Sequence, residues 1–392
     1  MQNGFWNIAR GSIICLLLAS FMIMVPGAQA AGDVTSSVDM KFWGRAIFNT
    51  HYDTGAMATD FMSYLNDDET ESWNFNPRDT RLGFSAGQTQ GNWGFRAVFE
   101  MDFYGDNNGN NLIPRMRLGY AEAKHLENGF SLRAGQDWIP VAQQNPGTID
   151  FGVMSWGGNL WWRVPQITAR YKPSNIEFLV SAMQHRDSNP QETAEKMPWL
   201  LGRIGFSDLL IDGSLIALGG GVRSVSFDGA EGEDSTDYSP YMAALELKIP
   251  FGSKGIALNG EVYMGQAVGR EFIHYGFDYN PAYPDGAKEI ESTGGFASLK
   301  VPVSPKVEFN LGAGVDDPKD EDMQGMEVAS IRYLKNQTAF LNFKHKITKN
   351  FGWGLEYVNF NTTKATGVEG DDTFTTNDLK GQRYTTSVWF VF

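Results

Sequence analysis

The sequence predicts an all-β protein, a transmembrane antiparallel β-barrel of about 16 strands. Three observations favour this fold: stretches of period-two alternation recur along the chain, long and tight connections alternate between them, and the last stretch ends on an aromatic residue, Phe392. Residues 93–103 show the alternation, because every second residue from Trp93 to Phe103 is apolar and the positions between include Arg96 and Glu100. Such a pattern is typical of a strand with one apolar face.

The N-terminal segment predicts export of the chain. One apolar run, residues 13–25, follows Arg10 and leads into Ala28-Gln29-Ala30, which are the charged, apolar and small-residue regions of a secretory signal peptide. We expect residues 1–30 to be removed. The single cysteine, Cys15, lies in this segment, so the mature protein should contain no disulfide. The formal net charge of -14 argues against a nucleic-acid partner.

The mature chain is read as one domain, because no composition break or linker divides residues 31–392. Alternation recurs about every two dozen residues within it and gives sixteen strands, an even number. The predicted strands cover 34–52, 78–87, 92–104, 112–124, 129–138, 159–171, 176–185, 198–209, 214–227, 238–250, 255–270, 288–301, 306–315, 328–346, 351–363 and 379–392.

The connections between these strands alternate strictly between long and short. A soluble β-sandwich has no reason to separate its connections by length in this way. Outer-membrane barrels have short periplasmic turns and long extracellular loops, so both termini are predicted to be periplasmic. The tight turns are centred on residues 88–91, 125–128, 172–175, 210–213, 251–254, 302–305 and 347–350. The long connections are 53–77, 105–111, 139–158, 186–197, 228–237, 271–287, 316–327 and 364–378.

The last predicted strand carries a signal for assembly. Tyr384, Val388, Phe390 and Phe392 share one face, so an aromatic face ends on the terminal residue. A C-terminal phenylalanine on such a strand resembles the signal that the outer-membrane assembly machinery reads. The alternative is an ordinary amphipathic last strand.

The third long connection, residues 139–158, differs from the others in polarity. Its only charge is Asp150, and it contains large apolar residues such as Phe151 and Trp156, whereas segment 53–77 has six acidic residues and no basic one. We therefore expect it to fold into the barrel as a constriction against the opposite wall, with Asp150 and the neutral residues 143–145 facing the stripe of arginines described next. A subunit contact or an external apolar patch is the alternative.

Arginines dominate one sector of the predicted inner wall. On strands 78–87 to 214–227, the face opposite the lipid carries eight arginines against Glu100, Asp102, Asp137 and Glu177. A guanidinium group stays charged and can hold a carboxylate through two parallel hydrogen bonds, so a row of them offers an anion successive weak sites. The alternative is that the arginines only balance inward acids. The residues predicted to line the solute path are Arg81, Arg96, Arg115, Arg117, Arg133, Arg170, Arg203 and Asp150.

Four motifs in the first half of the mature chain resemble the DcaP-like trimeric porins, which take up dicarboxylates and related small anions. The motifs are residues 74–84 (NFNPRDTRLGF), 135–138 (GQDW), 146–151 (PGTIDF) and 161–167 (WWRVPQI). The resemblance implies a sixteen-stranded homotrimer with a constricted, anion-preferring pore in each subunit. Family members can carry an N-terminal coiled coil, but here residues 31–40 run almost directly into a strand. A wider group of porins, including phosphate-selective ones, shares variants of Arg81-Leu82-Gly83-Phe84.

These observations together predict an outer-membrane porin of a Gram-negative bacterium. It would take up small hydrophilic solutes passively and prefer anions such as dicarboxylates. The alternatives are a general diffusion or phosphate-type porin, and, less favoured, a barrel enzyme or a lipid transporter. We expect no enzymatic activity and no cofactor, because the G-x-S-x-G match at residues 83–87 runs into a tight strand-to-strand turn. We also expect no metal site, because the five histidines never approach ligand spacing. The expected partners are small anionic solutes, outer-membrane lipid and lipopolysaccharide, the barrel assembly machinery and two further copies of the chain.

Overall fold

The computed structural model describes residues 38–105, 112–186, 194–227, 236–252, 255–273, 277–283, 287–369 and 373–392. The predicted signal peptide and parts of the predicted loops 105–111, 186–197 and 228–237 lie outside the described residues, as do parts of the predicted turn 251–254 and loop 364–378. Within the described residues the fold is all-β, with two short 3-10 helices, η1 (Asp320–Met323) and η2 (Val328–Ser330).

Sixteen antiparallel strands form a closed barrel, as the sequence predicts. The strands of the wall are β1 (Asp39–Asp53), β3 (Arg81–Gln90), β4 (Trp93–Asp102), β5 (Arg115–His125), β6 (Phe130–Trp138), β7 (Arg163–Tyr171), β8 (Ile176–Met183), β9 (Ala194–Ser207), β10 (Leu215–Phe227), β12 (Tyr241–Phe251), β13 (Ile256–Gln266), β16 (Glu291–Ser304), β17 (Val307–Pro318), β18 (Lys335–Lys346), β19 (Phe351–Glu369) and β20 (Thr373–Val391). Four short strands lie in the long connections: β2 (Ser72–Asn76), β11 (Thr236–Tyr238), β14 (Tyr279–Asn280) and β15 (Lys288–Glu289).

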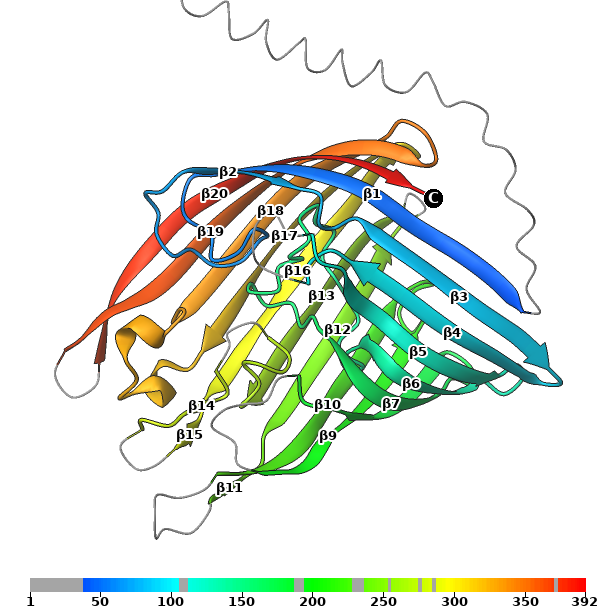
Figure 1. Ribbon diagram of the computed structural model, residues 1–392, viewed down its shortest axis with the longest axis horizontal. Helices are drawn as coiled ribbons and strands as arrows, with labels where there is room; N and C mark the ends of the chain where they lie inside the picture. Colours follow the sequence, from blue (N-terminus) through cyan, green and yellow to red (C-terminus); the bar gives the residue numbers. More distant parts are fainter. Residues whose placement is uncertain are drawn as a thin grey trace, which may run out of the picture. The chain divides into compact units, whose positions relative to one another are not determined.

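The first and last strands close the barrel. β1 pairs with β20 from Arg45 opposite Val391 to Asp53 opposite Arg383. On its other edge β1 pairs with β3 over its first half and with β2 over its second half. Figure 1 shows β1, in blue, beside β20, in red. Since every strand edge of the wall is paired, the backbone needs no hydrogen bonds from lipid.

Tight turns connect the strands at the end of the barrel where β1 begins and β20 ends. Gln90 pairs with Trp93, so the turn between β3 and β4 contains only two residues. Its first residue, Gly91, has a φ of 57°, a left-handed conformation that glycine adopts without steric cost. Short connections also follow β5, β7, β12, β16 and β18, so the predicted segregation of short turns and long loops is confirmed except at 364–378.

Two predicted connections are shorter than expected. Residues 72–76 form β2 instead of loop, and Pro77 then interrupts the strand before it resumes as β3 at Arg81. The predicted loop 364–378 is largely strand, because β19 continues to Glu369 and β20 begins at Thr373. These threonine-rich extensions suit β structure through their branched side chains, but they lack the apolar alternation of a lipid-facing strand.

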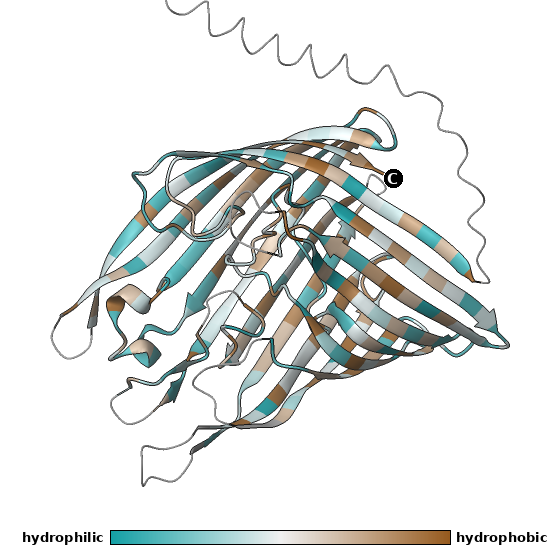
Figure 2. Cartoon of the chain, viewed as in Figure 1, coloured by the Kyte–Doolittle hydropathy of each residue, from teal (hydrophilic) through white to brown (hydrophobic). Residues whose placement is uncertain are grey.

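The two faces of the wall differ in polarity. Large apolar side chains such as Ile167, Val180 and Leu341 are exposed on the outer face, whereas Asn342, next to Leu341, is buried on the inner face. Brown and teal residues accordingly alternate along the strands in Figure 2. An apolar outer band of this kind is typical of a barrel surrounded by lipid. Among the described residues, no helix has the length and apolar character to cross a membrane.

Candidate functional site

The third long loop, residues 139–162, folds inside the barrel, which confirms the prediction for this segment. Ile139, Val141, Met154 and Leu160 are almost completely buried, and so is Phe151. The loop lies within the ring of strands in Figure 1. Burial of these side chains is the driving force for an inward path, because the same apolar surface would otherwise face water.

Carboxylates of the inner wall hold the backbone of this loop. The backbone N–H of Gln143 donates to Glu246 of β12 at 2.9 Å, and that of Leu160 donates to Glu261 of β13 at 2.6 Å. Charge-assisted hydrogen bonds of this type are stronger than neutral ones. Part of the acidic inner wall therefore serves to position the loop.

Asp150 lies near the middle of residues 139–162, where the loop reaches β20, the strand that closes the barrel. Its carboxylate accepts a hydrogen bond from Arg383 of β20 at 2.8 Å, and Arg383 also binds Asp53 of β1. The backbone N–H groups of Ile149 and Asp150 donate to Glu356 of β19 at 2.6 and 2.8 Å. The prediction that Asp150 faces the arginine stripe is therefore wrong, because the loop crosses the lumen and brings Asp150 to β20.

Phe151, the next residue, faces the arginines instead. Its ring centroid lies 5.7 Å from the guanidinium carbon of Arg117 and 5.9 Å from those of Arg81 and Arg115. It also stacks on Tyr104 with a centroid distance of 4.0 Å. Burial raises the pKa of the Tyr104 phenol well above its ordinary value, with nearby Asp79 contributing, so the hydroxyl stays neutral.

The seven predicted arginines all lie on the inner wall, and each forms an ion pair with a carboxylate there. Their side chains range from 47 % exposed at Arg96 to 1 % at Arg117. Arg81 pairs with Asp79, Arg96 with Glu122, Arg115 with Asp102, Arg117 with Glu100 and Asp102, Arg133 with Glu122 and Asp137, Arg170 with Glu177, and Arg203 with Glu177 and Glu246. Their role in solute passage stays a prediction.

Glu122 belongs to this network, although alternation along β5 had not placed it inside. The register with β4 shifts between Glu100 and Met101, which lie opposite Leu118 and Met116, and Arg117 is left between these pairs. A β-bulge of this kind reverses the alternation of the residues that follow. Glu122 therefore faces inward, and the acids on this wall are more numerous than the sequence predicts.

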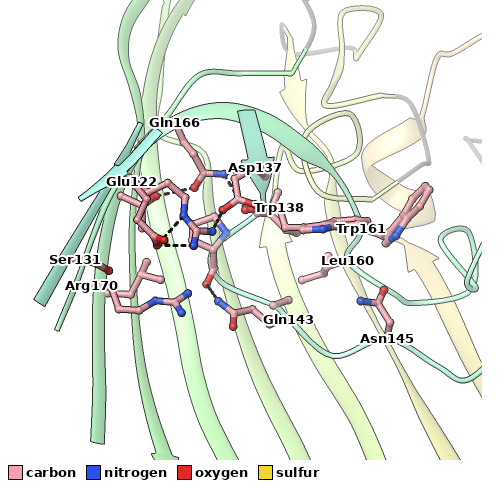
Figure 3. A pocket seen from close by; sticks show the side chains of 16 residues that line it. Glu122, Ser131, Asp137, Trp138, Gln143, Asn145, Leu160, Trp161, Gln166 and Arg170 are labelled. Carbon is pink, nitrogen blue, oxygen red and sulfur yellow. Dashed lines mark hydrogen bonds and ion pairs between the residues drawn. The ribbon is translucent and has the colours of Figure 1, made fainter. Parts of the chain in front are cut away.

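A cavity of about 260 Å³ separates the arginine wall from the start of the third loop. Arg133 and Arg170 line it from the wall, and Gln143 and Asn145 line it from the loop. Figure 3 shows Arg170 and Glu122 on the wall side, with Gln143 and Asn145 on the loop side. The predicted opposition of arginines and neutral amides occurs here, without Asp150.

One further arginine, Arg163, was missed as a site residue. Its side chain is 8 % exposed, and its guanidinium carbon lies 4.6 Å from the ring centroid of Trp138 and 4.8 Å from that of Trp161. Alternation along β7 places Arg163 on the lipid side, since it shares parity with Ile167. It lies inside because β7 begins at Arg163, directly after the inward loop. The sequence signal was its place in the motif 161–167, directly after the Trp161-Trp162 pair.

The described residues contain no group of three or more histidine, cysteine, aspartate or glutamate side chains placed to hold a metal ion. The arrangement instead provides fixed guanidinium groups, amides and indole rings around a water-accessible space. Such groups can bind and release a solute without changing it.

Comparison with known proteins relates the chain to outer-membrane channels. No protein-family model matches the sequence, and no curated protein matches it. The outer membrane channel DcaP of Acinetobacter baumannii is similar in structure, with a TM-score of 0.77, 20 % identity, and coverage of 93 % of this chain and 100 % of that one.

Two further structures are more distant. An anion-selective porin from Comamonas acidovorans has a TM-score of 0.61 and 14 % identity over 91 % of this chain and 100 % of that one. The trimer form of OmpT from Vibrio cholerae has a TM-score of 0.54 and 10 % identity over 91 % of this chain and 100 % of that one. The chain therefore has the fold of the DcaP channel and of outer-membrane porins, as its motifs predict.

Proposed function

We propose that the protein is an outer-membrane porin that lets small hydrophilic solutes pass passively and prefers anions such as dicarboxylates. The observation that carries the proposal is the cavity in which Arg133 and Arg170 lie across from Gln143 and Asn145. A solute between these groups meets donors on both sides, and carboxylate oxygens are the acceptors that guanidinium groups bind best.

The charge balance of this wall supports a preference for anions. Arg45 and Arg163 join the seven predicted arginines on it, giving nine guanidinium groups against the seven carboxylates that pair with them. The excess is two positive charges in a chain whose net charge is -14. A pore wall with a net positive charge raises the local concentration of anions.

A general diffusion porin is the second candidate. The observation that favours it is the pairing of every predicted arginine with at least one carboxylate, which leaves each less free to bind a solute. Arg170 is the weakest case, because its distance to Glu177 is 3.5 Å. Partial neutralisation suits a channel, since a deep binding site would hold the solute and slow its release.

Reversal potential in a salt gradient distinguishes the two candidates. The wild-type pore in a planar bilayer should favour chloride over potassium, and R133Q/R170Q should move the reversal potential toward zero and slow the uptake of succinate into liposomes. K319Q/K335Q removes two positive charges from exposed pairs near the long loops and serves as the matched control. A wild-type pore without ion preference contradicts the proposed selectivity and supports general diffusion.

The proposal includes a homotrimer in the outer membrane. Ala86, Ala97, Ala121 and Ala134 pair in register across β3, β4, β5 and β6, so one row of the outer face is flat. Small residues let two backbones approach closely in lipid. A121W should therefore yield a monomer by mass in detergent, whereas V262W on β13 should leave the trimer intact. A trimeric A121W would place the interface elsewhere.

The remaining proposed partners follow from the same surfaces. Outer-membrane lipid and lipopolysaccharide would contact the apolar outer face, and the barrel assembly machinery would read the strand that ends in Phe392. The proposal contains no catalytic step.

A further inference from the structure

Arg163 is chemically unlike the other arginines of the wall. Among the described residues, none of the ion pairs includes its guanidinium group, and Nη1 is buried with no hydrogen-bond partner. The group lies beside the rings of Trp138 and Trp161, 4.6 and 4.8 Å from centroids that are themselves 5.7 Å apart. An indole face attracts a cation, but it supplies no counter-charge.

The surroundings of Arg163 add to its positive potential. Asp102, a nearby carboxylate of the same wall, is shared by Arg117 and Arg115, at 2.8 and 2.9 Å. Arg117 also lies 5.6 Å from the ring of Trp138, so two guanidinium groups border one indole. A buried charge without its own partner is costly, and a mobile anion is a means of compensating it.

The two indoles that hold Arg163 also line the cavity between wall and loop. Figure 3 shows both Trp138 and Trp161 at the edge of this space. The guanidinium group therefore contacts two aromatic rings that border the solute path, and aromatic rings screen charge far less than water does. Its field therefore reaches an anion in the cavity with little attenuation.

We propose that Arg163 is the specificity-determining residue of the pore, because it supplies the positive charge that no carboxylate neutralises and that a passing oxyanion meets beside Trp138 and Trp161. This inference rests on the proposed anion-preferring channel. It assigns the preference to a residue outside the predicted stripe, and it gives the paired arginines a supporting role along the path.

The test compares three variants with the wild-type pore in a potassium chloride gradient. R163Q removes the charge, and R163M also removes it but keeps an aliphatic stem beside the indoles. Both should lower the chloride-to-potassium permeability ratio by about threefold or more, because a pore charge concentrates counter-ions at least tenfold in favourable cases. R163K keeps the charge and should retain most of the preference.

A second-site variant separates the effect of the charge at residue 163 from the effect of the total charge of the lumen. Glu308 pairs with Lys300 at 3.0 Å, on β17 and β16, away from the arginine wall. R163Q/E308Q therefore restores the lumen's total charge without restoring Arg163, and we expect its permeability ratio to stay low. Full recovery in this double variant would overturn the inference.

The outcomes also separate this inference from the proposed function. A wild-type pore with anion preference and an unchanged ratio in folded R163Q contradicts only the role of Arg163. A wild-type pore without preference overturns both. Folding is checked for each variant by heat-modifiable mobility. If the neutral variants do not fold, R163K decides alone: retained preference supports the charge of residue 163, and its loss contradicts it.

Discussion

The carboxylate of Asp150 and the guanidinium group of Arg383 lie 2.8 Å apart, joining the third long loop to the last strand. Arg383 binds Asp53 at the same time, at 2.7 and 2.8 Å, and these two residues pair across the seam between β20 and β1. One buried guanidinium group therefore links barrel closure to loop docking. A pore can keep its bore constant in this way, because the loop is tied to the two strands that close the barrel.

The first prediction concerns this link. D150N should leave Arg383 paired with Asp53 but remove one charge-assisted hydrogen bond, at a cost of about 1.5–3 kcal/mol. The loop should then leave the wall more often, so single-channel current should become noisier and the temperature of the heat-modifiable transition should fall. D317N is the matched control, since Asp317 pairs with Lys335 at the exposed end of the barrel. Equal transition temperatures for D150N and D317N would disprove the link.

The second prediction separates two neighbouring arginines. Arg117 is completely buried between Glu100 and Asp102, whereas Arg115 is 32 % exposed and binds Asp102 alone. R117Q should destabilise the barrel by about 3–5 kcal/mol, because it takes the ion-pair partner from Glu100 and leaves the buried Asp102 with Arg115 alone. R115Q should cost much less and change mainly ion preference. Unfolding of the two variants in urea, followed by gel mobility, measures their stabilities. Similar midpoints for R117Q and R115Q would argue against this difference.

The strand count could be predicted because alternation is a local property. Each lipid-facing strand shows it within about ten residues, whatever the rest of the chain does. β2 was missed because Pro77 interrupts the pattern between Asn76 and Arg81. The extensions of β19 and β20 were missed because their threonines lack an apolar face to alternate with. Prediction fails where a strand departs from the lipid.

The candidate site could be predicted only in part. Alternation assigned the arginines to the inner wall, and low charge assigned the third loop to the lumen. The partner of Asp150 and the inward position of Arg163 depend on the path of that loop through the barrel, which no periodic pattern encodes. Glu122 depends on one bulge at Arg117. Single irregularities of this kind determine which charged side chains form ion pairs.

The third prediction concerns orientation. The segment from Lys319 to η2 contains several exposed residues at the long-loop end, whereas much of segment 53–77 is packed, with Met62 and Leu65 buried. Protease added to intact cells should therefore cut within 319–330 and leave the turn at residues 172–175 intact. Cutting at residues 172–175 in intact cells, or cutting at 319–330 only after the outer membrane is opened, would reverse the orientation. Mass spectrometry of the fragments locates the cuts.

The last prediction concerns assembly through Phe392. The backbone of Phe392 exchanges two hydrogen bonds of 3.0 Å with Gly44 of β1, and its ring lies so close that a Cβ at Gly44 would fall 2.5 Å from Cζ. The residue can therefore matter for packing at the seam, for recognition during assembly, or for both. F392K should accumulate as unfolded chain in the periplasm, because the last strand loses its terminal aromatic ring.

Two further variants separate recognition from packing. F392Y keeps an aromatic end and should assemble. G44A keeps Phe392 but introduces a methyl group against its ring and against the carbonyl oxygen of Arg81, 2.6 Å away. It should reach the outer membrane and unfold at a lower temperature, because overpacking costs about 1–3 kcal/mol. Membrane fractionation with heat-modifiable mobility measures both properties. Normal assembly of F392K would show that the ring serves packing alone, because the assembly machinery would then accept a chain with a charged C-terminal residue.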